Sequence, residues 1–164
     1  MLDGSQTSQR SNSWTRYGGE DMFVIDASVY VSRLRREEAQ HAESARLFEA
    51  VAARRAPVLC PEILLPEVAA ALARGLEDPD FAHRAASHLR RLPGHRFIPV
   101  DRVLSELAAR LAAERRLRGC DAIYAALARQ EGIPLVTWDE QQRNRAAPVV
   151  EALTPSEALA ALER

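Results

Sequence analysis

Four acidic residues stand where short apolar runs end or where helical patterns begin. Asp26 ends the run Phe23-Val-Ile-Asp26, and Asp139 ends Leu135-Val-Thr-Trp-Asp139. Glu67 and Asp121 open Ala/Leu-rich helical patterns. If all four lie at one edge of a sheet, their carboxylates repel each other strongly unless a cation lies between them. Hard oxygen ligands suit Mg²⁺ or Mn²⁺, which activate water and neutralise charge on a phosphate, so the set points to phosphodiester hydrolysis.

Each acid taken alone also has a purely structural explanation. Asp121 and Glu67 could complement the dipoles of the helices that they open. Asp26 could be a helix N-cap, and Asp139 could form a turn. The prediction of a metal site therefore depends on the four residues meeting in space.

Composition excludes some kinds of chemistry. The chain has 164 residues, of which 47% are hydrophobic and 27% charged, as in a soluble globular protein. All 22 basic residues are arginine, so an enzyme that needs a lysine Schiff base or a Walker A lysine is excluded. The net charge of -1 gives no overall attraction to a polyanion, which would have to be bound by local arginines or through metal. Cys60 and Cys120 form no CxxC pair, and we expect both to be buried thiols.

The chain is organised as one domain behind a polar leader. Residues 1–21 are rich in Ser, Gly and Gln without an apolar period, which predicts a disordered leader, and residues 22–164 form a single domain. No apolar stretch reaches the roughly 18 residues of a membrane span and no secretion signal is evident, so we expect a cytoplasmic protein without a membrane partner.

Short apolar runs alternate with long helical patterns, which is typical of a parallel sheet with crossover helices. The expected strands are Met22–Asp26, Pro57–Cys60, Arg96–Val100, Ile133–Thr137 and a weaker Pro148–Glu151. The expected helices are Val29–Leu34, Gln40–Arg54, Glu62–Gly75, Asp80–Leu92, Arg102–Arg118, Asp121–Glu131 and a short last helix from about Pro155, capped by Thr154. In such sheets ligands bind at the carboxyl ends of the strands where the strand order reverses. Asp26 and Asp139 would both project there.

The motifs that carry the acids are, in order, Ile25-Asp26-Ala-Ser28, Pro66-Glu67-Val, Asp121-Ala-Ile-Tyr-Ala-Ala-Leu-Ala128 and Thr137-Trp-Asp139-Glu140. Their order and spacing resemble the PIN-domain nucleases, most closely the VapC toxins of toxin–antitoxin pairs. The resemblance covers Met22 to about Leu159. It implies a three-layer α/β/α sandwich with a central parallel sheet of about five strands. It also implies an RNA substrate, Mg²⁺ or Mn²⁺ as cofactor, a homodimer and a VapB-like antitoxin.

Carried over by position, the resemblance makes Asp26, Glu67, Asp121 and Asp139 the acidic quartet, with Ser28 and Thr137 as hydroxyls lining the site. We hypothesise that Asp26 and Asp121 hold the main metal, while Glu67 and Asp139 complete the charge and orient the attacking water. One-metal and two-metal variants both remain open.

Three arginines lie at spacings that place them near the acids, and a bidentate guanidinium suits a phosphate. Arg118 precedes Asp121 by three residues, and we take it, with Arg74 and Arg143, as a candidate RNA contact. The alternative is that these arginines are simply solvated. For the whole chain, the alternative to a ribonuclease toxin is a non-catalytic PIN-fold module that sequesters RNA or a protein. A small phosphatase acting through Asp26 is disfavoured, because the motif lacks a second Asp and the chain has no lysine.

Overall fold

A computed structural model describes residues 21–164, so the expected leader at 1–21 lies, except for Asp21, outside the described residues. Five parallel strands form one sheet in the order β3-β2-β1-β4-β5. The strands are β1 (Phe23–Ile25), β2 (Val58–Pro61), β3 (His95–Ile98), β4 (Leu135–Val136) and β5 (Ala152–Leu153).

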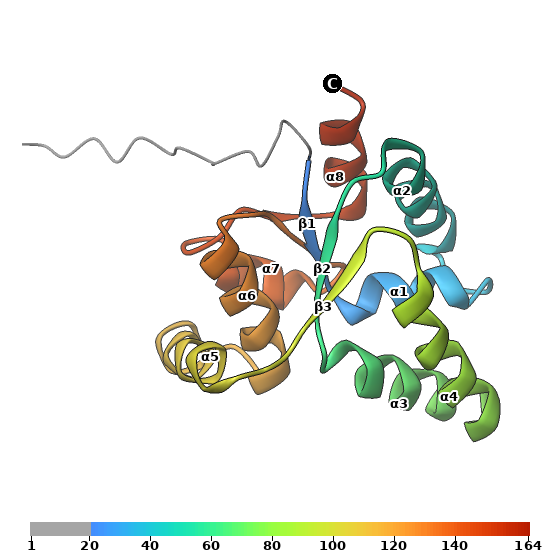
Figure 1. Ribbon diagram of the computed structural model, residues 1–164, viewed down its shortest axis with the longest axis horizontal. Helices are drawn as coiled ribbons and strands as arrows, with labels where there is room; N and C mark the ends of the chain where they lie inside the picture. Colours follow the sequence, from blue (N-terminus) through green and yellow to red (C-terminus); the bar gives the residue numbers. More distant parts are fainter. Residues whose placement is uncertain (1–20) are drawn as a thin grey trace, which may run out of the picture.

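Eight α-helices in the described part of the chain surround this sheet, which gives the expected three-layer α/β/α fold. In Figure 1, α5, α6 and α7 lie on one side of the strands, and α1 to α4 lie on the other, with α8 beside α2. Their bounds are α1 (Ala27–Leu34), α2 (His41–Arg54), α3 (Leu64–Leu76), α4 (Pro79–His88), α5 (Arg102–Arg115), α6 (Gly119–Glu131), α7 (Glu140–Ala146) and α8 (Pro155–Leu162).

The central strands are apolar along their whole length because helices cover both of their faces. All residues of β1, β2 and β4 are buried. The longest run of buried residues in a helix is in α6, from Tyr124 to Ala128, where alanines let the helix approach β1 and β2 closely. This packing holds the start of α6 beside the central strand.

Polar side chains fix the starts of several helices, and two of them are members of the acidic quartet. Asp26 caps α1 by accepting from the backbone N–H of Ser28, and Asp139 caps α7 by accepting from that of Gln142. Thr154 caps α8, as expected, in a reciprocal capping box with Glu157. An N-cap of this kind contributes about 1 kcal/mol. The capping explanation is therefore confirmed for Asp26, whereas Asp139, which was expected to form a turn, is an N-cap as well.

Some boundaries differ from the sequence expectations. The helix α7 was not predicted, because its seven residues are mostly polar and show no apolar period. The last strand, expected at Pro148–Glu151, instead forms at Ala152–Leu153, where the chain pairs with β4. The helix expected over Asp80–Leu92 ends at His88 and continues as a 3₁₀ turn, Leu89–Arg91.

Two further expectations need correction. The helix expected to reach Arg118 ends at Arg115, and α6 begins at Gly119, which leaves Arg118 in the short connection between them. Of the two free thiols, Cys60 is buried as expected, whereas Cys120 is partly exposed at the start of α6. None of the helices in residues 21–164 has the length and hydrophobicity that a membrane crossing requires.

Candidate metal-dependent nuclease site

The strand order reverses at β1, and the candidate site lies at the carboxyl ends of β1 and β4. β1 pairs with β2 on one side and with β4 on the other, so the strands that follow β1 in the chain lie on both sides of it. Asp26 follows β1 directly, and Thr137 follows β4 directly. Their side chains meet, with Thr137 Oγ1 3.3 Å from Asp26 Oδ2. Open parallel sheets bind ligands at this kind of position, outside the carboxyl ends of the strands where the strand order reverses.

Asp26 is the most enclosed of the four acids, with only 6% of its surface exposed. Burial raises the pKa of its carboxyl above the ordinary value, and the nearby charge of Asp121 raises it further. Hydrogen bonds from Ser28 and Gln142 act in the opposite direction and favour the ionised form. The backbone N–H of Ser28 donates to Asp26 Oδ2 at 2.9 Å. Asp26 is thus a buried carboxylate held in one orientation by neighbouring donors.

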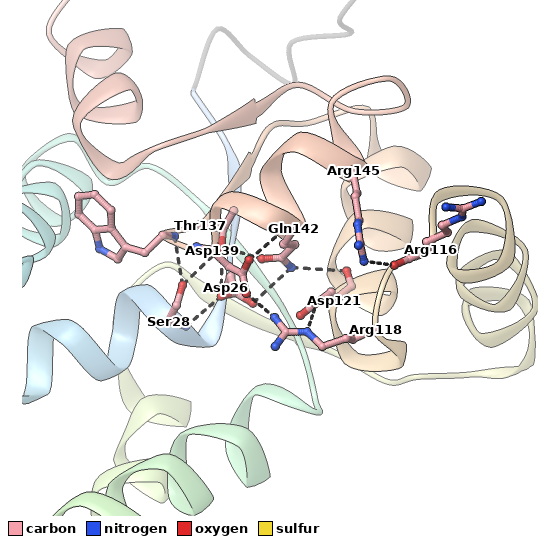
Figure 2. A network of polar contacts seen from close by, with 10 residues as sticks. Asp26, Ser28, Arg116, Arg118, Asp121, Thr137, Asp139, Gln142 and Arg145 are labelled. Carbon is pink, nitrogen blue, oxygen red and sulfur yellow. Dashed lines mark hydrogen bonds and ion pairs between the residues drawn. The ribbon is translucent and has the colours of Figure 1, made fainter.

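A guanidinium lies between two of the other acids, as Figure 2 shows. Arg118 Nε donates to Asp121 Oδ2 at 2.7 Å, and its Nη2 donates to Asp139 Oδ2. Asp139 loses solvation on burial, but the N–H of Gln142 and the charge of Arg118 outweigh that effect and lower its pKa. Arg118 therefore joins the start of α6 to the start of α7 through charge.

Glu67 reaches the same region from the first turn of α3. The phenol of Tyr124, on α6, donates to Glu67 Oε2 at 2.6 Å. Burial raises the pKa of Glu67, the bond from Tyr124 lowers it, and the charges of Asp26 and Asp121 raise it. The structure thus brings Glu67 within electrostatic reach of the other acids.

The two expected hydroxyls lie beside Asp26. Ser28 Oγ is 3.4 Å from Thr137 Oγ1 and accepts from the backbone N–H of Trp138 at 3.1 Å. The Trp138 indole N–H donates to Ser44 Oγ at 2.8 Å, and Ser44 in turn bonds to Ser32. These bonds tie the connection after β4 to α1 and α2. They fix the backbone that carries Asp139.

The carboxylates of the four acids are chemically suited to bind a hard divalent cation. Carboxylate oxygens are the ligands that Mg²⁺ and Mn²⁺ prefer. Within residues 21–164, no three His, Cys, Asp or Glu side chains stand close enough to form a closed metal site. Instead a cation of another kind, the Arg118 guanidinium, is bound by Asp121 and Asp139. The acids already attract positive charge, and a metal bound through the same two carboxylate oxygens would compete with Arg118.

The three candidate RNA-contacting arginines occupy different places. Arg118 contacts the acids directly, whereas neither Arg74, in the last turn of α3, nor Arg143, in the last turn of α7, pairs with them in the described residues. Sequence reasoning missed Gln142 and Tyr124. Their spacing, three residues after Asp139 and three after Asp121, was the available signal, because such residues share one turn of helix.

The chain resembles known proteins over the part that contains this site. The PIN domain family model matches residues 23–148, which span all four acids and both hydroxyls. The chain belongs to the PIN domain family. Comparison with curated protein sequences gave no match.

Solved structures with the same fold include VapC toxins. VapC20 of Mycobacterium tuberculosis, a sarcin–ricin-loop-cleaving toxin, is 26% identical with a TM-score of 0.65, covering 80% of this chain and 98% of its own. A chain of VapBC2 from Rickettsia felis, crystallised with promoter DNA, is 13% identical with a TM-score of 0.62, covering 81% and 98%. A chain of FitAcB from Neisseria gonorrhoeae is 19% identical with a TM-score of 0.63, covering 82% and 99%. These likenesses confirm the PIN fold expected from the sequence.

Proposed function

We propose that this PIN domain is a metal-dependent endoribonuclease and the toxin of a VapBC-type toxin–antitoxin pair. The observation that carries the proposal is the arrival of Asp26, Glu67, Asp121 and Asp139 at one sheet edge from separate elements. Burial and mutual charge raise the pKa of Asp26 and of Glu67, which is a cost to the fold that a bound cation would remove. We take residues 22–164 as the single domain that carries this activity.

In this proposal the four acids have two different roles. Asp26 and Asp121 hold a Mg²⁺ or Mn²⁺ ion, and Glu67 and Asp139 complete the negative charge and orient the attacking water. When bound, the ion lowers the pKa of water and neutralises charge building up on the phosphate. The backbone N–H of Ser28 keeps the Asp26 carboxylate aligned, and the Thr137 hydroxyl lines the site beside it.

Arginine supplies the contact with the substrate. Arg118 is 62% exposed in its side chain, so once released from Asp121 and Asp139 it can reach a phosphate beside the acids. We also propose Arg74 and Arg143, in the last turns of α3 and α7, as contacts for flanking nucleotides. They remain predictions, because neither pairs with the acids.

The likeness to toxins studied with their partners supports a VapB-like antitoxin for this chain as well. One solved structure with this fold, from Klebsiella pneumoniae, is named as a toxin–antitoxin complex. We propose a homodimer that acts on RNA in the cytoplasm and that the antitoxin holds inactive.

The test is cleavage of RNA by the purified full chain with Mn²⁺ or Mg²⁺, beside the variants Asp26→Asn and Asp121→Asn. A sarcin–ricin-loop oligonucleotide is the first substrate to try, because VapC20 cleaves that loop. We expect metal-dependent cleavage by the wild type and a loss of at least about a hundredfold in each variant, the scale of losing a group that stabilises the transition state. Equal cleavage by all three proteins would indicate a contaminating nuclease. Absence of cleavage of any RNA, with RNA still bound, would support the binding module instead.

A further inference from the structure

One buried glutamine contacts three of the four acidic residues, one through its backbone N–H and two through its side-chain amide. Gln142, in the first turn of α7, is only 1% exposed. Its backbone N–H donates to Asp139 Oδ1 at 2.9 Å. Its side-chain Nε2 lies 3.5 Å both from Asp26 Oδ1 and from the backbone carbonyl of Asp121. Its Oε1 is 2.6 Å from Thr137 Oγ1. Gln142 therefore lies at the junction of β1, β4, α6 and α7 (Figure 2).

The neighbours of this amide fix which way round it lies. The Thr137 hydroxyl accepts from the N–H of Asp139 at 3.0 Å and has a single proton to donate. That proton goes to Gln142 Oε1 at 2.6 Å rather than to Asp26 at 3.3 Å. The amide nitrogen then faces a carboxylate oxygen of Asp26 and the carbonyl oxygen of Asp121, which are suited to accept its two hydrogens. The opposite orientation would place the amide oxygen against these two acceptors.

This arrangement holds both oxygens of the Asp26 carboxylate. Oδ2 accepts from the N–H of Ser28, and Oδ1 faces the amide of Gln142. Both amide hydrogens of Gln142 have acceptors, one on Asp26 and one on the carbonyl of Asp121. A buried amide without such partners would destabilise the fold, because it would lose its hydrogen bonds to water without replacement. The neighbouring Gln141, which is exposed, shows that the same residue type on α7 does not have to be buried.

We propose that Gln142 is a positioning residue of the acidic site, whose side-chain amide holds Asp26 and the start of α6 in register for binding a divalent cation. The inference rests on the proposed function. A packing role would need only the volume of the Gln142 side chain, whereas the positioning role needs its amide. Groups that orient metal ligands typically change metal affinity or activity by about 10- to 100-fold when they are removed.

The decisive variant is Gln142→Met, which keeps the length of the side chain and removes the amide, with Gln141→Met as its matched control. Mn²⁺ affinity is measured by titration calorimetry, and RNA cleavage is measured as kcat and KM. We expect Gln142→Met to weaken Mn²⁺ binding and lower kcat by about tenfold or more, while KM for RNA stays within about twofold. Gln141→Met should match the wild type in every measurement. If Gln142→Met binds Mn²⁺ and cleaves RNA like the wild type, the proposal is overturned.

A measurement on the wild type covers the case in which Gln142→Met does not fold. In NMR spectra of the full chain, the side-chain amide of Gln142 should exchange with solvent much more slowly than that of Gln141, and only the Gln142 amide should shift when Mg²⁺ is added. A Gln142 amide that exchanges as fast as Gln141, or that ignores Mg²⁺ while Mg²⁺ supports cleavage, would overturn the positioning role alone. A wild type that binds neither ion would count against the proposed function and this inference together.

Discussion

Replacing Arg118 with alanine should strengthen metal binding while weakening catalysis on RNA. Arg118 bridges Asp121 and Asp139 through one oxygen of each, and a metal that uses these two oxygens has to displace it. The side chain of Arg118 is 62% exposed, and those of Asp121 and Asp139 are 13% and 27% exposed. Ion pairs this accessible to water contribute about 0.5 to 1 kcal/mol each. Removing both contacts therefore releases about 1 to 2 kcal/mol, which corresponds to about 5- to 30-fold tighter metal binding.

Titration calorimetry with Mn²⁺ on the full-length wild type and on Arg118→Ala measures this change. Arg110→Ala is the matched control, because Arg110 is exposed on α5 and forms no ion pair among residues 21–164. The gain in Arg118→Ala should shrink as the salt concentration rises, because salt screens partly exposed ion pairs. The KM for RNA should rise in the same variant, because a phosphate contact is lost.

These opposite effects separate the proposed role from a purely structural one. A structural arginine would weaken both metal and substrate binding when it is removed. Metal affinity in Arg118→Ala that is equal to or below that of the wild type, with Arg110→Ala unchanged, would refute the idea that the guanidinium competes with metal.

Two further results are expected. Tyr124→Phe removes the phenol that lowers the pKa of Glu67, so the pKa of Glu67 should rise further. Because metal binding needs the ionised carboxylate, the acidic limb of the pH–rate profile should move to higher pH. An unchanged acidic limb would exclude Glu67 from the groups whose titration sets the rate. Thr154→Ala removes the N-cap of α8, whose hydrogen bonds all go to residues of α8. It should lower stability by about 1 kcal/mol and the melting temperature by about 2 to 4 °C without changing RNA cleavage, as calorimetry and the cleavage assay would show.

Most of the fold was predictable because its signals are local or periodic. The apolar runs that became β1, β2 and β4 are buried on both faces, and such strands show as continuous apolar sequence. The elements that were misplaced lack these signals. β5 has two residues, and it forms where it does only because β4 offers an edge to pair with.

The acidic quartet was predictable as a set of positions, although not as an arrangement. Asp26 and Asp139 follow strands whose carboxyl ends had to share an edge, which is a consequence of parallel topology. The interposed Arg118 was not predictable, because its contact with Asp139 joins residues 21 positions apart across two elements. That contact changes the expectation for the site, since a metal bound through the same carboxylate oxygens would compete with an internal cation.

The sequence by itself determined the capping hydrogen bonds between residues that are close together in the chain. Asp26 accepts from Ser28, Asp139 from Gln142 and Thr154 from Glu157, all within three residues, so residue type and spacing suffice to set them. Only the tertiary structure decided the contacts that give the site its chemistry. Tyr124 meets Glu67 across 57 positions, and Gln142 meets Asp26 across 116. Such pairs depend on the strand order β3-β2-β1-β4-β5 and on the close packing of α6 against β1, which no local pattern specifies.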